Sequence, residues 1–378
     1  MSYSLYRKYR PKTFSDLLGQ ESVQTVLQNA AKQKAFSHAY LFYGPRGTGK
    51  TTAARLLAKL ANCLTRVADI KFATQGEPCN TCDACLEIDS GRALDVIEID
   101  AASNRGIDEI RSLKESVRIS PTRYVHKIFI IDEVHMLTKD AFNALLKTLE
   151  EPPAHVMMIL ATTEYDKVPA TITSRVQRMH FRRLMLKEII KKLETIVKLE
   201  SLRVTPDALE FIATVAEGSL RDAESLLSQV AAMRDEVNVM TVERIIGRVS
   251  RTVIRDVASA LLAKDIARTL QLVQELFTQG HNLVDFTKEL ITYLRRVLAV
   301  KFDPTLAALL ENELPHEEVE LLKTQSATLV VPFVIALLRS LIRAYCEMRY
   351  SPVVLAPLEV AVVESITATT LTTQDISK

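Results

Sequence analysis

The chain has 378 residues, of which 48% are apolar, and a formal net charge of +2 from 48 basic and 46 acidic side chains. This length and composition suffice for two or three domains with cores of their own, and the balance of charge excludes a strongly basic, DNA-coating surface. No run of about twenty uncharged apolar residues occurs, and the first ten residues lack the apolar core of a signal peptide, so we expect a cytoplasmic protein with no membrane partner.

Strand-like and helix-like segments alternate over residues 1–181. This alternation predicts a doubly wound, parallel α/β sheet. The expected strands lie near residues 40–43, 94–99, 127–132, 156–162 and 177–181.

A glycine-rich loop follows the first expected strand and precedes residues 52–60, which favour a helix. The loop fits the pattern G-x-x-x-x-G-K-[ST], in which backbone N–H groups wrap a polyphosphate, the lysine reaches the β and γ oxygens, and the hydroxyl binds Mg²⁺. Lys50 and Thr51 would take the last two roles. The nucleotide-binding residues predicted from the loop are Gly44, Pro45, Arg46, Gly47, Thr48, Gly49, Lys50, Thr51 and Thr52.

Four of the five cysteines, Cys63, Cys79, Cys82 and Cys85, follow this helix with the spacing C-x15-C-x2-C-x2-C. Four thiolates so spaced predict a closed, tetrahedral Zn²⁺ site of structural type. A disulfide is disfavoured in a reducing compartment, and a redox C-x-x-C pair does not use four thiols. Residues 65–78 are expected to be a loop, which makes residues 63–85 an insert in the sheet domain. Cys346, on an apolar helical stretch, is expected to be a core thiol.

The apolar run 128–131 predicts a buried strand that delivers Asp132 and Glu133 to the carboxyl edge of the sheet. Asp132 would hold Mg²⁺ together with Thr51, and Glu133 would orient or activate the attacking water. The two carboxylates and the glycine-rich loop therefore predict a nucleoside triphosphatase that uses ATP and Mg²⁺.

Strand signals stop after Phe181, and helical periodicity takes over. Residues 182–248 predict a small helical domain with helices at 186–199, 206–216, 219–233 and 242–247, of which two would start at Thr205-Pro206 and Ser219. Residues 249–366 predict a third, all-helical domain with helices at 252–263, 265–279, 282–302, 317–325, 329–349 and 355–365. The polar end, residues 367–378, is expected to be a disordered tail.

Several segments together resemble one family. They are residues 9–21, the glycine-rich loop, the four-cysteine insert, and residues 98–103, 132–137, 143–153, 161–163, 174–175 and 218–223. In these segments the chain is similar to the gamma/tau subunits of the bacterial DNA polymerase III clamp loader, which are AAA+ ATPases. The resemblance implies an AAA+ domain at 1–181, a lid domain at 182–248 and a collar-type oligomerisation domain at 249–366, although the third domain matches only in length and helical character.

The resemblance also implies roles for residues outside the two phosphate and metal motifs. Thr162 and Thr163 would include the sensor that hydrogen-bonds the attacking water or the γ-phosphate, and Arg221 would be a second sensor in the lid. Arg175 would be an arginine finger that acts in trans on a neighbouring subunit's ATP. Val176 stands where the family has a cysteine. Without the resemblance, a satisfied strand-end threonine and surface arginines are the simpler interpretation of these residues.

Two further groups of residues are implied to contact ligands. The adenine side of the nucleotide would be lined by Arg7, Tyr9, Arg10 and Pro11. Arg105, at the start of an expected helix, would contact template phosphates, with a solvated helix cap as the alternative.

The implied function is that of an ATPase motor subunit within the DNA polymerase III holoenzyme. It would form a pentameric ring with delta-type and delta-prime-type subunits and copies of itself, open the sliding clamp, and load it onto primer-template DNA. One alternative is an AAA+ branch-migration or replication-restart helicase, because Asp-Glu-Val-His resembles helicase motifs; the cysteine insert and the third domain disfavour it. The other is a non-hydrolysing scaffold of the same architecture, which the intact Lys50, Asp132 and Glu133 disfavour.

Overall fold

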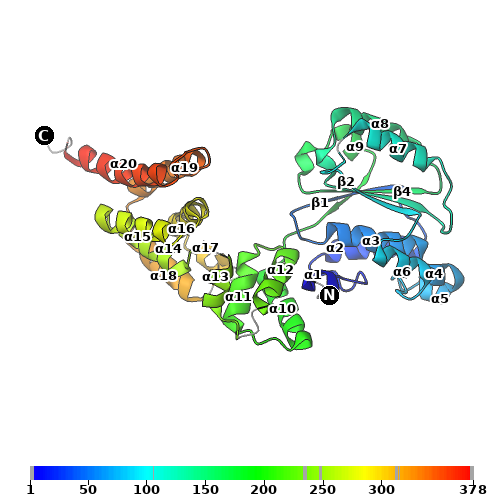
Figure 1. The fold of residues 1–378 in the computed structure, drawn as a ribbon, viewed down its shortest axis with the longest axis horizontal. Helices are drawn as coiled ribbons and strands as arrows, with labels where there is room; N and C mark the ends of the chain where they lie inside the picture. The colour runs from blue at the N-terminus through cyan, green and yellow to red at the C-terminus, as the bar shows by residue number, and fades with distance from the viewer. Residues whose placement is uncertain are drawn as a thin grey trace. The chain divides into compact units, whose positions relative to one another are not determined.

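A computed structural model of the protein describes residues 4–104, 106–232, 236–246, 249–310, 314 and 316–374 (Figure 1). Its internal contacts divide the chain into two compact units, which are described separately. The first unit comprises residues 1–201 and 215–228, and the second comprises residues 202–214 and 229–378. All the described residues expected to bind the nucleotide belong to the first unit.

The first unit is built on a parallel sheet. Within the described residues its strands are β1 (Ala39–Tyr43), β2 (Val96–Asp100), β3 (Lys127–Asp132), β4 (Val156–Thr162) and β5 (Gln177–His180). Their order is β2-β3-β4-β1-β5, and each pair of neighbours is parallel. Every strand begins and ends within two residues of the range expected from the sequence, which confirms the doubly wound α/β prediction.

Alternating side chains along the strands build a core on each face of the sheet. Tyr40 and Phe42 of β1 belong to one buried cluster, and Leu41 between them belongs to the other, because successive side chains of a strand point to opposite faces. The first face is covered by α2 (Glu21–Lys32) and α3 (Lys50–Asn62), and the second by α7 (Ile107–Val117) and α8 (Lys139–Glu150), as Figure 1 shows. Burial from both sides explains the continuous apolar run of β3.

Shorter elements complete the first unit. They are α1 (Leu5–Lys8), α4 (Leu64–Ala68), α5 (Ile70–Ala73), α6 (Asp83–Ser90), the 3-10 helices η1 (Val134–Met136) and η2 (Tyr165–Lys167), α9 (Ala170–Thr173), α10 (Leu186–Glu200) and most of α12 (Leu220–Ala231). Ser219 starts α12 as expected, since its Oγ accepts a hydrogen bond of 3.3 Å from the Asp222 N–H.

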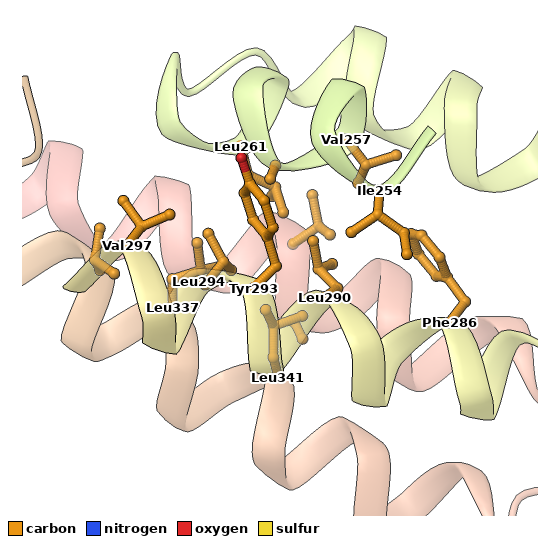
Figure 2. Packing of buried hydrophobic residues seen from close by; sticks show 14 of the residues in the cluster. Ile254, Val257, Leu261, Phe286, Leu290, Tyr293, Leu294, Val297, Leu337 and Leu341 are labelled. Carbon is orange, nitrogen blue, oxygen red and sulfur yellow. The ribbon is translucent and has the colours of Figure 1, made fainter. Parts of the chain in front are cut away.

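The second unit is helical in its described residues. Its helices are α11 (Pro206–Val215), α13 (Val239–Ile246), α14 (Arg251–Leu262), α15 (Ile266–Thr278), α16 (Leu283–Phe302), α17 (Thr305–Leu310), α18 (His316–Ala327), α19 (Val331–Met348) and α20 (Leu355–Gln374). Figure 2 shows Phe286, Leu290 and Val297 of α16 packed among side chains of α14 and α19. Their spacing is the helical repeat that the sequence displays.

Three details differ from the expectations. Residues 65–78 include the short helices α4 and α5 rather than loop alone. Cys346 is exposed on α19, so the prediction of a core thiol is wrong: α19 turns Leu337, Leu341 and Ala344 inward and Cys346 outward. The helix α20 continues to Gln374, into the segment expected to be a tail.

Among the described residues, no single helix is both long and apolar enough to span a membrane. The helices α18 and α19 reach that length and hydropathy only when they are counted together, and the chain bends by 120° between them. Side chains of both helices belong to the core of the second unit.

Candidate nucleotide-binding site and metal centre

The glycine-rich loop leaves β1 at the carboxyl edge of the sheet. The last residue of β1 is aligned with Thr162, the last residue of β4, and Asp132 ends the next strand, β3. Glycine is required at two loop positions because no side chain fits there: a Cβ at Gly44 would lie 2.1 Å from the Phe181 carbonyl oxygen, and one at Gly47 would lie 1.9 Å from Ser219 Oγ. The loop is therefore packed tightly between the end of β5 and the start of α12.

Lys50, the first residue of α3, is 5% exposed. Its ammonium donates hydrogen bonds to the carbonyl oxygens of Gly44 (2.8 Å) and Pro45 (2.7 Å), so the loop curls around the charge. Burial lowers the pKa of Lys50, and the nearby carboxylates of Glu133 and Asp132 oppose this effect. An incoming phosphate could replace the two carbonyls as the partner of the ammonium.

Thr51 and Asp132 face each other across the site. The Thr51 hydroxyl donates a 2.7 Å hydrogen bond to Asp132 Oδ2, and burial raises the pKa of Asp132 against the effect of that bond. Mg²⁺ takes oxygen ligands at about 2.1 Å, so neighbouring ligands lie about 3 Å apart. The donor types and their spacing fit a shared Mg²⁺, which Thr51 and Asp132 would hold and which would neutralise phosphate charge when bound.

Glu133 follows Asp132 with a left-handed backbone (φ +48°), which turns its side chain toward the end of β4. There Glu133 Oε2 accepts hydrogen bonds from the Thr163 hydroxyl (2.9 Å) and the Thr163 N–H (3.2 Å). The site therefore brings together Lys50, Thr51, Asp132, Glu133 and Thr163, all of which the sequence predicted as site residues.

Thr162, the other predicted sensor, is fully buried. Its hydroxyl lies 3.0 Å from His135 Nδ1 and accepts a 3.0 Å hydrogen bond from the Glu164 N–H. Neither His135 nor Glu164 was singled out from the sequence. The position of His135 in Asp-Glu-Val-His, two residues beyond Glu133, was the only available signal.

The N-terminal residues and the lid helix α12 meet beside the loop. The guanidinium of Arg221 lies over the Tyr6 ring at 5.1 Å, and the Leu5 N–H donates a 3.0 Å hydrogen bond to Ser228 Oγ. The Tyr9 hydroxyl donates a hydrogen bond of 2.5 Å to Glu200 of α10. These contacts join the segment that contains Arg7, Arg10 and Pro11 to the helices α10 and α12.

The remaining predicted residues lie apart from these contacts. Arg175, after α9, donates hydrogen bonds to Glu150 Oε1 (2.9 Å from Nε) and to the Thr171 carbonyl (2.7 Å). Arg46 is an exposed loop residue, and Thr52 lies in the first turn of α3. Arg105 lies outside the described residues.

The four cysteines of the insert converge. Their sulfur atoms all lie within 4.8 Å of one another, with Cys79 Sγ 3.9 Å from Cys85 Sγ and Cys82 Sγ 4.0 Å from Cys63 Sγ. Zn–S bonds of 2.3 Å in a tetrahedron place the sulfurs about 3.8 Å apart. The cluster therefore fits a structural Zn²⁺, which the four thiolates would hold.

Backbone and charge support the same cluster. Backbone N–H groups of Thr81 (3.4 Å) and Cys82 (3.3 Å) point at Cys79 Sγ, and a hydrogen bond from Cys85 lowers the pKa of Cys63. Cys63 directly follows the last residue of α3 as its C-cap. The buried ammonium of Lys59, on α3, donates a 3.1 Å hydrogen bond to Asn80 of the insert and pairs with Asp89 of α6. The insert is thus fixed to the helix whose first residues form the phosphate site.

Comparisons with known proteins cover nearly the whole chain. Sequence profiles match for "DNA polymerase III, delta subunit" over residues 19–185, for "DNA polymerase III clamp loader subunit, ATPase lid domain" over 188–236, and for "DNA polymerase III subunits gamma and tau domain III" over 237–377.

Curated relatives agree with these profiles. The tau subunit of DNA polymerase III from Bacillus subtilis is 47% identical over 314 residues, which are 82% of this chain and 54% of that protein. The gamma subunit from Buchnera aphidicola subsp. Acyrthosiphon pisum is 38% identical over 299 residues, 79% of this chain and 81% of that protein. The chain thus spans about half the length of the tau relative.

A solved structure of the RuvB Holliday junction branch migration motor of Thermotoga maritima is also similar. It is 17% identical and covers 67% of this chain and 79% of its own, with a TM-score of 0.45. A likeness this distant carries no argument about function.

Proposed function

The chain belongs to the gamma/tau family of bacterial DNA polymerase III subunits, and on this basis we propose that it is the ATP-driven motor subunit of a clamp loader. It joins a pentameric ring with delta-type and delta-prime-type subunits and copies of itself, opens a sliding clamp, and loads it onto primer-template DNA. Its proposed location is the cytoplasm, where chromosomal replication takes place in bacteria.

One observation carries the proposal: Lys50 and Thr51 stand opposite Asp132 and Glu133 at a single edge of the sheet, with Thr51 2.7 Å from Asp132. In the proposed mechanism Lys50 leaves its carbonyl partners for the β and γ oxygens of ATP. Thr51 and Asp132 would hold Mg²⁺, and Glu133 orients the water that attacks the γ-phosphorus. Thr162 or Thr163 senses that phosphate from the end of β4.

The lid supplies the conformational step. Arg221 rests on Tyr6 in the described arrangement, and in the proposal its guanidinium moves to the γ-phosphate when ATP binds. Arg7, Tyr9, Arg10 and Pro11 enclose the adenine. Because these residues are joined to α10 and α12, the position of the lid would report the state of the nucleotide.

The proposed partners, DNA and neighbouring subunits, are inferred from the family and from the charge of the chain. The balanced composition of the chain argues for a DNA grip made by local residues such as Arg105 and by helix N-termini rather than by bulk charge. Arg175, held by Glu150, is proposed to neutralise charge on a neighbouring subunit's ATP. Zn²⁺ in the four-cysteine insert is proposed to be structural, because four thiolates leave no open position for chemistry.

The test is the dependence of ATP turnover on clamp and DNA. The chain, assembled with delta-type and delta-prime-type subunits, should hydrolyse ATP fastest when the clamp and primed DNA are present together, and labelled clamp should remain on the DNA. Lys50→Ala is the matched negative control. Full stimulation by DNA alone would favour the helicase alternative. ATP binding without turnover in any mixture would favour the scaffold.

A further inference from the structure

His135 lies in η1, directly after the two site carboxylates, and contacts two other elements. Its side chain is 6% exposed. Nδ1 lies 3.0 Å from Thr162 Oγ1 at the end of β4 and 3.4 Å from Glu133 Oε2, and Nε2 lies 3.2 Å from Glu164 Oε1. One ring therefore touches the proposed sensor and the proposed water-orienting carboxylate.

The chemistry of these partners limits how the ring can be arranged. Glu164 Oε1 lies beside Nε2 at 3.2 Å, and a carboxylate attracts the positive edge of an imidazole ring. Glu164 is itself anchored by Lys167 at 2.8 Å. The contact with Glu164 holds the Nε2 side of the ring, and Nδ1 on the other side faces Thr162 and Glu133.

The Thr162 hydroxyl is then fixed as well. Its oxygen already accepts the Glu164 N–H at 3.0 Å, so the second direction of the hydroxyl group is set by Nδ1 of His135. A threonine at a strand end can otherwise rotate its hydroxyl proton freely. The ring thus holds the buried Thr162 hydroxyl in one orientation at the end of β4, directly before Thr163.

We propose that His135 is a positioning residue that links Thr162 to Glu133, so that the end of β4 and the water-orienting carboxylate keep one relative position during hydrolysis. This inference rests on the proposed ATPase function. It identifies how Thr162 at the end of β4 and the Glu133 carboxylate keep their relative positions. His135 itself does not contact the nucleotide.

A double-mutant cycle on the full chain, assembled with its partner subunits, tests the coupling. The variants are His135→Ala, Thr162→Val and the double variant. Each single change should lower single-turnover hydrolysis about 10- to 100-fold, since a displacement of about 1 Å can cost a hundredfold, while the Kd of a fluorescent ATP analogue stays within about twofold. Because residues that act as a unit are non-additive, the double variant should be no slower than the slower single variant.

Two further variants separate positioning from folding. His155→Ala removes a histidine of the same unit whose Nε2 lies 3.3 Å from the Val117 carbonyl, and it should leave turnover unchanged. His135→Asn places an amide near the position of Nδ1 but cannot reach Glu164, so it should recover part of the rate. If His135→Ala does not fold, the hydrolysis rate of His135→Asn can still be compared with that of the wild type.

Unchanged turnover in His135→Ala, or single effects that multiply in the double variant, would overturn the inference. So would a loss of nucleotide affinity as large as the loss of rate, because the ring would then support the site as a whole. Failure of the wild-type assembly to bind or hydrolyse ATP would instead refute the proposed function, and the two failures are thus distinguishable.

Discussion

The proposed roles of single side chains at the carboxyl edge of the sheet can be tested one at a time, beginning with Lys50. Its ammonium is held by two loop carbonyls, which a phosphate would replace, so Lys50→Ala should abolish nucleotide binding while the fold survives. Titration with a fluorescent ATP analogue and a thermal melt measure both properties. A variant that binds ATP with the wild-type Kd would remove Lys50 from the phosphate site.

Glu133 should separate binding from chemistry. Its carboxylate is bound by Thr163 and is not part of the Thr51–Asp132 pair. We expect Glu133→Gln to retain ATP affinity and to lose turnover by about a hundredfold or more, since the amide cannot take a proton from water. Filter binding and phosphate release report the two steps. Normal turnover would show that another group orients the water.

Glu224 of α12 is a buried carboxylate with a consequence for pH. It is 4% exposed, and among the described residues its Oε1 has no hydrogen-bond partner. Burial raises the pKa of Glu224 to about 8, although the charges of Lys192 and Arg10 oppose this effect. The folded protein therefore holds a proton that the unfolded chain, with a pKa of about 4.3, releases.

The free energy of unfolding should accordingly fall as pH rises from about 4.3 to 8, because Glu224 ionises in the unfolded chain while the folded protein keeps its proton. Above about pH 8 the effect of Glu224 should level off. Glu224→Gln cannot ionise, so it should exceed the wild type in unfolding free energy at pH 9, by on the order of 3–5 kcal/mol as an upper bound, and match it near pH 4. Thermal melts at several pH values test this. Glu194→Gln, at an exposed position of α10, is the control. A difference independent of pH would contradict the assignment.

At the scale of elements, the four-cysteine insert should bind close to one Zn²⁺ per chain, whether or not ATP is present. Cys82→Ser should lower the metal content and the melting temperature more than it lowers hydrolysis, because a closed site contributes to folding and not to chemistry. Metal analysis and thermal melts measure this. Cys346→Ser, on the exposed face of α19, should change neither. Four freely titratable thiols in a metal-free protein would refute the site.

The sequence predicted the elements that are marked by a repeat of apolar residues or by glycines at sterically restricted positions. The strands follow from apolar runs, and the loop follows from glycines that no other residue could replace. The exposure of Cys346 was not predicted because α19 carries apolar side chains on more than one face, so the sequence does not show which face is buried. The helices α4 and α5 were missed because a cap from Asp69 and the packing of the insert, rather than an apolar repeat, support such short helices. The contacts of His135 and the burial of Glu224 depend on residues distant in sequence, which no local pattern encodes.

At the scale of the whole molecule and its assembly, Arg175 should act between subunits. Its present partners, Glu150 and Thr171, belong to α8 and α9. Arg175→Ala should leave the ATP affinity of the isolated chain unchanged and lower hydrolysis by the assembled ring about a hundredfold or more, through lost stabilisation of transition-state charge. Mixing this variant with Lys50→Ala should restore some turnover. An equal loss in the isolated chain would mean that Arg175 acts in cis or supports the fold.

The strand order also determines what can form while the chain is being synthesised. β1 is made first, but its partners β4 and β5 begin only at Val156 and Gln177. The cysteines are complete at Cys85, before β2 begins at Val96. Capture of zinc by the four thiolates at the end of α3 can therefore precede any pairing of strands, since the sheet must wait for residues far downstream. Zinc scarcity during translation should thus reduce the yield of folded protein while leaving the specific activity of the surviving molecules intact.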